Sequence, residues 1–286
     1  MYWLIIGAVA LVQSASCAYD SNYELSVAEK YVYFSGAAYC ADPRFKKSGV
    51  EEWTCKACQK YPGVDATVFS SSRDGVGYVG YYPDDNEIII AFSGTNPFDI
   101  QEWIDDLDFL KMDYPYCDGC NVHEGFYKTY LSVSDQVWNL TSAYLSEHPS
   151  ATVTCTGHSL GAALASHCAA DLSYKGIAAT MTTAYTYGMP RVGDEAFEKW
   201  YIETVPGTFR VVHRKDPVPR MFPQNMGFHH MAYEVFYEKD KNDWKLCSIE
   251  GEDETCANQY TVSLDVLNHL DYLDFSFTTN WIDCEL

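Results

Sequence analysis

Apolar and polar residues follow one another along the chain in patterns that predict helices and strands. Apolar side chains at near-helical spacing predict an amphipathic helix over 25–39, whereas the charged segment 41–62, with two cysteines and two prolines, is predicted to be a loop. Two runs rich in β-branched and aromatic residues, Val76–Tyr82 and Glu87–Phe92, predict strands. The four residues between them, PDDN, are typical of a β-hairpin turn.

The middle of the chain predicts a helix, a strand and a second helix. Six apolar residues recur at intervals of four and three and mark one face of a helix: Phe126, Tyr130, Val133, Val137, Leu140 and Tyr144. A strand-like run over 151–156 precedes an Ala- and Leu-rich run that predicts a helix from Leu160. Further strands are predicted at 183–187, 208–213 and 232–237. This alternation indicates an α/β fold in which helices cover both faces of a mostly parallel sheet.

The N-terminus is predicted to be a signal peptide over 1–18, followed by one catalytic domain over 19–286. The apolar run 2–12 is too short to span a bilayer, and small residues follow it up to Ser16-Cys17-Ala18. No lysine or arginine precedes the run, so the alternative is a buried N-terminal helix. We expect a secreted protein, with the lumen of a vesicle or a lysosome-like compartment as the alternative location.

The cysteines agree with an oxidising compartment. The chain has eleven, and removal of Cys17 leaves ten, which is many for a cytosolic enzyme. The C-x-x-C pairs at 55–58 and 117–120 allow a four-thiolate zinc site, but they lie far apart in sequence, and short disulfides are the preferred interpretation. Cys155 and Cys168 are expected to be small buried side chains with free thiols.

Composition and charge narrow the functional classes. With 286 residues and 47% hydrophobic composition the chain can bury a large core. Its formal net charge of −21 argues against nucleic acid and strongly anionic membranes as partners.

The strongest chemical signal is Gly157-His158-Ser159-Leu160-Gly161, a G-x-S-x-G between the predicted strand and the following helix. A serine at such a sharp turn is exposed at its tip, and glycine two residues away on either side removes clashing side chains. The following helix directs its first amides towards the place where an oxyanion would form. A solvent-facing serine in a glycine-flanked turn is the alternative. The sequence therefore predicts that Ser159 is a nucleophile.

A serine nucleophile needs a histidine base and an acid that orients it. Asp216 stands in the turn just beyond the predicted strand 208–213, where an acid is expected in an open α/β sheet. The downstream histidines are His229, His230 and His269, and chemistry alone leaves His230 and His269 as close competitors.

Several ordered motifs over 31–272 resemble the class 3 lipases, typified by the triacylglycerol lipases of filamentous fungi. They are AFSGT at 91–95, EWIDDLDF at 102–109, VHEGF at 122–126, the G-x-S-x-G, YTYGMPRVG at 185–193 and DPVP at 216–219, followed by GFHH at 227–230 and LNHLDY at 267–272. The resemblance implies an α/β-hydrolase fold and a triad of Ser159, Asp216 and His269. It also implies that His229 and His230 belong to a structural segment and that neither is the catalytic base.

The resemblance further implies an oxyanion hole formed by the amides of Thr95 and Leu160. Three positions depart from the family pattern without removing a catalytic group: Ser93 replaces an arginine, Ala162 a glycine and Asn268 an aspartate. Four disulfides are implied: Cys40–Cys284, Cys55–Cys58, Cys117–Cys120 and Cys247–Cys256.

Segment 96–104 places Phe98, Ile100 and Trp103 among acidic residues just after the oxyanion segment. It is predicted to be an amphipathic lid that covers the site and rolls over at an oil–water interface, with an ordinary surface helix as the alternative. Feruloyl esterases share the fold but as a rule have a polar lid, so Trp103 favours long-chain acylglycerols.

We therefore expect a monomeric interfacial lipase that needs no cofactor or metal, with a feruloyl-type or short-chain esterase as the alternative. A catalytically inactive lipid-binding protein is a second alternative, because a fold does not fix a function. Asn139-Leu140-Thr141 is a glycosylation sequon.

Overall fold

The structure is a computed structural model that describes residues 23–45, 49–177, 181–231, 233–249, 251–260 and 265–285. The predicted signal peptide and its cleavage site lie outside the described residues. No helix in the described ranges is both long enough and apolar enough to span a membrane.

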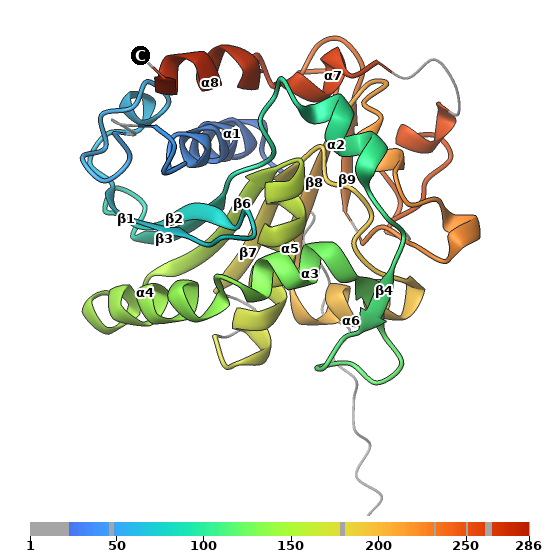
Figure 1. The fold of residues 1–286 in the computed structure, drawn as a ribbon, viewed down its shortest axis with the longest axis horizontal. Helices are drawn as coiled ribbons and strands as arrows, with labels where there is room; N and C mark the ends of the chain where they lie inside the picture. Colours follow the sequence, from blue (N-terminus) through green and yellow to red (C-terminus); the bar gives the residue numbers. More distant parts are fainter. Residues whose placement is uncertain are drawn as a thin grey trace, which may run out of the picture.

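One eight-stranded sheet forms the centre of the molecule, in the order β1-β2-β3-β6-β7-β8-β9-β10 (Figure 1). The strands from β3 to β9 are parallel, whereas β1, β2 and β10 pair antiparallel at the two edges. This confirms the predicted mostly parallel sheet. The strand bounds are β1 (Asp65–Ser70), β2 (Val76–Tyr82), β3 (Glu87–Phe92), β6 (Thr152–His158), β7 (Thr182–Tyr187), β8 (Gly207–His213), β9 (Glu234–Tyr237) and β10 (Lys245–Leu246).

Helices cover both faces of the sheet, and each face has its own apolar core (Figure 1). On one face lie α1 (Leu25–Tyr39) and α8 (Phe277–Glu285). On the other lie α3 (Glu124–Leu131), α4 (Ser134–Glu147), α5 (Leu160–Tyr174) and α6 (Glu195–Thr204). Successive residues of β3 point to opposite faces, so Ile89 joins the first core and Ile90 the second. Because both of its faces are buried, β3 has an almost continuous apolar sequence.

The apolar face predicted for one helix over 126–144 belongs to two helices, so that prediction was wrong in this respect. Helix α3 ends at Leu131, and the Ser132 hydroxyl donates a hydrogen bond to the Thr129 carbonyl at 2.6 Å. Helix α4 begins at Ser134. The break lets α3 pack on α5 while α4 packs on β2 and β3. The periodicity survives because only two residues separate the helices.

Shorter elements complete the chain. The helix α2 (Ile100–Asp106) follows β3, and the small sheets are β4 (Lys111–Asp113) with β5 (Asn121–His123), and β11 (Asp271–Tyr272) with β12 (Phe275–Ser276). The helix α7 (Leu267–Leu270) precedes β11. Four 3₁₀ turns are η1 (Cys58–Lys60), η2 (Val218–Arg220), η3 (Gln224–Met226) and η4 (Ala257–Gln259).

The cysteines form the four disulfides that the resemblance implies: Cys40–Cys284, Cys55–Cys58, Cys117–Cys120 and Cys247–Cys256. Both C-x-x-C pairs are thereby oxidised, which removes the thiolates that a zinc site would need. Cys155 and Cys168 are free and buried, with their sulfur atoms 3.4 Å apart. Asn139 lies on the exposed side of α4.

Candidate functional site

The parallel strands bring the predicted site residues to one edge of the sheet. Ser159 follows β6, Gly188 follows β7 and Asp216 lies three residues after the end of β8. Thr95 lies three residues after β3. Because the carboxyl ends of parallel strands meet at the same edge, residues far apart in sequence converge there.

Ser159 occupies a strained turn between β6 and α5. Its backbone has φ 60° and ψ −127°, a conformation that costs a non-glycine residue free energy and is tolerated where the surroundings impose it. A Cβ on Gly157 would lie 2.3 Å from the carbonyl of Gly161, and a Cβ on Gly161 would lie 2.2 Å from the Phe92 carbonyl oxygen. The turn therefore needs both glycines, as the sequence predicts. The Ser159 amide donates to the Tyr187 carbonyl at 2.9 Å, which ties the turn to β7.

Asp216 and His269 form a buried pair with no exposed surface. The Nδ1 atom of His269 lies 3.0 and 2.9 Å from the two carboxylate oxygens. The carboxylate also accepts hydrogen bonds from the Val218 amide at 2.8 Å and from the Tyr272 hydroxyl. An ionised carboxylate only accepts, so Nδ1 of His269 is the donor in this pair, and in the neutral ring Nε2 is then the nitrogen that can accept a proton.

Two buried polar atoms of the candidate triad have no hydrogen-bond partner in the part of the chain that the structure describes. Among the described residues, neither the Ser159 hydroxyl nor Nε2 of His269 has a hydrogen-bond partner, and neither residue is exposed. Most buried polar atoms are bonded, but unpaired ones also occur elsewhere among the described residues, at Ser173 and Thr182 for example, so these two atoms mark the site only together with its geometry.

His230, the competing candidate base, is committed elsewhere. Its Nε2 donates to the Pro219 carbonyl at 2.6 Å, and its backbone amide donates to Glu252 at 2.8 Å. Burial and the neighbouring Arg210 hold the pKa of His230 well below its usual value. His230 therefore braces the segment behind the acid, while His269 is the histidine that contacts Asp216.

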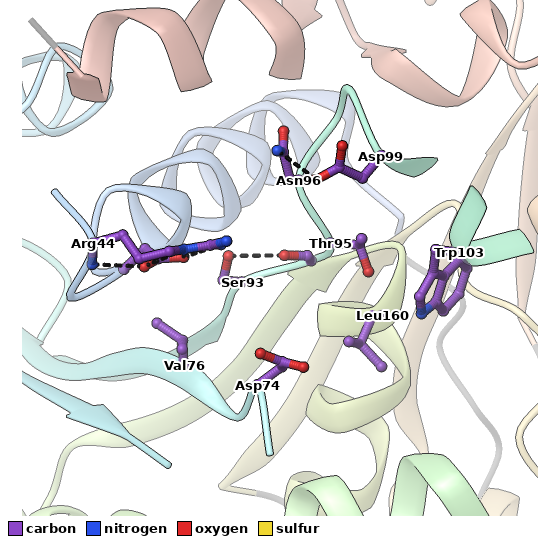
Figure 2. A pocket seen from close by; sticks show the side chains of 11 residues that line it. Arg44, Asp74, Val76, Ser93, Thr95, Asn96, Asp99, Trp103 and Leu160 are labelled. Carbon is purple, nitrogen blue, oxygen red and sulfur yellow. Dashed lines mark hydrogen bonds and ion pairs between the residues drawn. The ribbon is translucent and has the colours of Figure 1, made fainter. Parts of the chain in front are cut away.

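The predicted oxyanion residues Thr95 and Leu160 line a cavity whose wall includes neither Ser159 nor His269. Ser93, Gly94, Thr95, Trp103 and Leu160 contribute to its wall (Figure 2). Leu160 is the first residue of α5, and the first amides of a helix have no acceptor within it.

The predicted lid corresponds to a loop and the short helix α2. Ile100 is buried and Trp103 is half-buried, with its ring stacked on Phe126 at 6.2 Å between centroids. Figure 2 shows Trp103 beside Leu160 at the cavity. Phe98 is not packed in this way, because 62% of its surface is exposed.

Three positions that shape the site were not singled out from the sequence. A Cβ on Gly188, which has φ 58°, would lie 2.8 Å from the Asp216 carboxylate and 2.9 Å from the His269 ring. Tyr272 bonds the acid, and Arg220 donates to the backbone carbonyls of Asp216 and Arg214. Gly188 and Tyr272 stand inside motifs that the resemblance contains, so their positions carried a signal, whereas nothing local marks Arg220.

The site offers no set of metal ligands. Among the described residues, the one cluster of three ligand-type side chains is Glu234, Cys247 and Cys256, and its two sulfurs form a disulfide.

Residues 89–226 match the family Lipase (class 3). The chain is 33% identical to a lipase of Rhizopus niveus over 253 residues, which is 86% of this chain and 63% of that protein. It is 30% identical to the secreted mono- and diacylglycerol lipase A of Penicillium camembertii over 229 residues, covering 78% and 73% of the two chains. The chain thus spans less than two thirds of the length of the Rhizopus relative.

A solved structure described as a triacylglycerol lipase whose catalytic centre is a serine protease triad superposes with a TM-score of 0.83. The two chains are 29% identical, and the match covers 90% of this chain and 97% of the other. The α/β-hydrolase fold expected from the sequence is therefore confirmed.

Proposed function

Since this chain belongs to the class 3 lipase family, we propose that it is a serine ester hydrolase acting on acylglycerols. The observation that carries the proposal is the buried Asp216–His269 pair, whose histidine backbone bonds His158, the residue before Ser159.

In the proposed reaction the Ser159 hydroxyl attacks the ester carbonyl while Nε2 of His269 takes its proton. Asp216 holds the Nδ1–H tautomer and stabilises the imidazolium that forms. The tetrahedral intermediate places its negative oxygen near the amides of Thr95 and Leu160, and the Thr95 hydroxyl is a third candidate donor. His269 then protonates the leaving alcohol, and an acyl group remains on Ser159.

Hydrolysis of the acyl-enzyme repeats these steps with water as the nucleophile. His269 accepts a proton from water, the hydroxide oxygen bonds to the acyl carbon, and collapse of the second intermediate returns the proton to the Ser159 oxygen. No step needs a cofactor, because the attacking oxygen, the base and the oxyanion donors all belong to the chain or to water.

The lid supports a substrate presented at an interface. Ser159 has no exposed surface and Trp103 lines the cavity together with Leu160, so in this proposal a substrate requires α2 to move. Moving it exposes the apolar side chains of Ile100 and Trp103, which is unfavourable in water and favourable against an oil phase. Phe98, Ile100 and Trp103 would then face lipid together, with Phe98 already positioned in solvent.

We further propose that the mature chain begins at Tyr19 and is a secreted monomer. Four disulfides are compatible with an oxidising compartment, and the Penicillium relative is described as secreted. A short-chain or feruloyl-type esterase remains the second candidate function, because the triad chemistry is common to all of these substrates.

One experiment tests the proposal and separates the candidates. Hydrolysis of a triglyceride is followed through its solubility limit, alongside a short-chain nitrophenyl ester, for the wild type, Ser159→Ala and Trp103→Ser. We expect Ser159→Ala to be inactive on both, and the wild-type rate on triglyceride to rise disproportionately once droplets form. Trp103→Ser should flatten that rise and retain ester hydrolysis.

Each opposing result has its own meaning. A wild-type rate that follows substrate concentration smoothly through the solubility limit makes α2 an ordinary surface helix and favours the esterase. A folded wild type with no activity on any ester leaves a lipid-binding protein.

A further inference from the structure

A chain of buried hydrogen bonds passes between the oxyanion segment and the base without involving Asp216. Its members are Tyr39, the last residue of α1, and His158, the residue before Ser159. The Tyr39 hydroxyl lies 2.7 Å from Nδ1 of His158, and Nε2 of His158 lies 2.6 Å from the backbone carbonyl oxygen of His269. Tyr39 has no exposed surface and His158 is 1% exposed.

The chemistry of the partners gives these bonds a direction. A carbonyl oxygen only accepts, so Nε2 of His158 must carry the hydrogen that bonds His269. Burial and the neighbouring His269 lower the pKa of His158 well below its usual value, which keeps the ring neutral. The unprotonated Nδ1 then accepts from the Tyr39 hydroxyl.

The Tyr39 oxygen also lies against the oxyanion segment, at Gly94. Burial raises the pKa of Tyr39, and a hydrogen bond from the Gly94 backbone opposes that shift. The approach is close, because a Cβ on Gly94 would lie 2.2 Å from the Tyr39 oxygen. Tyr39 therefore packs against Gly94 and donates to His158, and His158 donates to the His269 carbonyl.

We propose that Tyr39 and His158 are positioning residues that hold the oxyanion segment and the base in register with the nucleophile. Gly94 precedes the oxyanion residue Thr95, His158 precedes Ser159, and the last acceptor belongs to His269 itself. The inference rests on the proposed serine hydrolysis. Tyr39 contacts the backbone of Gly94, and His158 bonds the backbone of His269. The two side chains therefore set main-chain positions and take no proton from the substrate.

The base needs such support because little regular structure holds it. The helix α7 has only four residues, and the two-residue strand β11 follows it at the next residue. A backbone shift of His269 would move Nε2 relative to Ser159, and misplacement of about 1 Å costs on the order of a hundredfold in rate.

The test compares two tyrosines that each lose one buried hydroxyl. Tyr39→Phe removes the hydrogen bond to His158. Tyr78→Phe instead removes a hydroxyl that donates to the Phe34 carbonyl at 3.2 Å, away from the reacting groups. Both tyrosines are fully buried, so similar losses of stability are expected from thermal unfolding. On a soluble nitrophenyl ester, Tyr39→Phe should lower kcat by about ten- to a hundredfold with KM almost unchanged, and Tyr78→Phe should leave both constants near wild type.

A second pair addresses His158 and serves if Tyr39→Phe does not fold. The amide nitrogen of His158→Gln can still donate to the His269 carbonyl, whereas His158→Leu cannot. We expect the glutamine variant to recover part of the kcat that the leucine variant loses. Equal kcat values for these two folded variants, or equal losses in Tyr39→Phe and Tyr78→Phe, would overturn the inference. An inactive wild type would instead overturn the proposed function.

Discussion

Ser159 and the Asp216–His269 pair lie at the same edge of the sheet but are held there by different means. Backbone geometry holds the serine: a strand, a helix and two glycines that let main chains touch. The acid stands in a loop and the histidine in the four-residue helix α7, and side chains from near and distant segments hold them. Arg220 bonds the Asp216 backbone, Tyr272 bonds its carboxylate and His213 bonds the carbonyls of Asn268 and Asp271. A locally encoded turn thus meets a side assembled by tertiary contacts.

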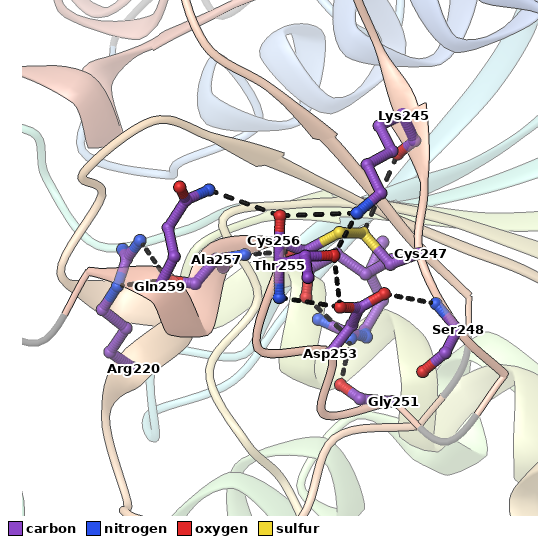
Figure 3. The surroundings of a disulfide bond; sticks show 12 residues. Arg220, Lys245, Cys247, Ser248, Gly251, Asp253, Thr255, Cys256, Ala257 and Gln259 are labelled. Atoms are coloured by element: carbon purple, nitrogen blue, oxygen red, sulfur yellow. Dashed lines mark hydrogen bonds and ion pairs between the residues drawn. A yellow bond between two sulfur atoms is a disulfide. The ribbon is translucent and has the colours of Figure 1, made fainter.

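The bracing of the acid extends to a disulfide. Nε and Nη2 of Arg220 donate to the Ala257 carbonyl at 3.0 and 2.7 Å, and Ala257 follows Cys256 of the Cys247–Cys256 bond (Figure 3). The Ala257 amide in turn donates to Glu234 on β9 at 2.8 Å. The position of the acid therefore depends on a loop some forty residues further along the chain. We therefore expect substitutions far from Asp216 to lower kcat by degrees. On the serine side, by contrast, a single substitution in the turn should prevent folding.

The largest effect is expected where the two sides must act together. Ser159→Ala and His269→Ala should each lower kcat by several powers of ten, and the double variant should lose little more, because the pair acts as one unit. Steady-state kinetics of the three variants on a soluble ester checks this. Losses that multiply would mean that the two residues act independently.

On the serine side, Gly161→Ala should prevent folding rather than only reduce activity. Its Cβ would meet the Phe92 carbonyl oxygen at 2.2 Å, and two backbones packed in a core cannot separate cheaply. The cost should exceed the roughly 1–3 kcal/mol typical of overpacking. Yield of soluble protein and urea unfolding measure it. Gly63→Ala is the control, because a Cβ there meets no atom within 4 Å and only its φ of 89° is unfavourable.

On the acid side, Arg220→Met should fold and lose activity by about ten- to a hundredfold through kcat. The methionine fills similar space but leaves the carbonyls of Asp216, Arg214 and Ala257 without their donor. Unfolding should show a loss on the order of 1–3 kcal/mol. Unchanged kcat in a folded variant would show that the turn of Asp216 holds itself.

A smaller effect on kcat is expected from Cys247→Ser with Cys256→Ser. The pair closes a sequence separation of 9, for which chain entropy gives about 3 kcal/mol. The matched control is the double variant Cys55→Ser with Cys58→Ser. It removes a disulfide that has a sequence separation of 3 and lies away from the acid. Only the first double variant should lower kcat, measured at a temperature where both are folded. Equal kcat values would disconnect this disulfide from the acid.

The smallest effect on kcat is expected at His167, where burial affects the dependence of stability on pH. Burial lowers the pKa of His167 to about 3, and both of its ring nitrogens lack partners among the described residues. The unfolded chain binds a proton there below pH of about 6.5 while the folded chain does not, so stability falls as pH drops from about 6.5 towards 3. His167→Leu should flatten the pH dependence of urea midpoints in that window. An unchanged slope would assign the dependence to other groups.

Much of the fold and of the site could be predicted from the sequence, because the determinants were local. The bounds of the first helix and of the first hairpin strands match those of α1, β2 and β3, since apolar periodicity directly reports which side is buried. Gly157 and Gly161 predicted the sharp turn that holds the candidate nucleophile Ser159, because such a strand-to-helix turn excludes side chains at these two positions.

Tertiary structure decided what periodicity and chemistry left open. The pattern over 126–144 could not reveal that α3 and α4 divide at 132–133, because the two helices preserve the same spacing while packing on different elements. Chemistry alone could not choose between His230 and His269, and resemblance was needed to favour the second. Their contacts differ because Pro219 bonds one ring and Asp216 the other. Such long-range pairings depend on where the sheet brings chain segments together, and no local pattern encodes them.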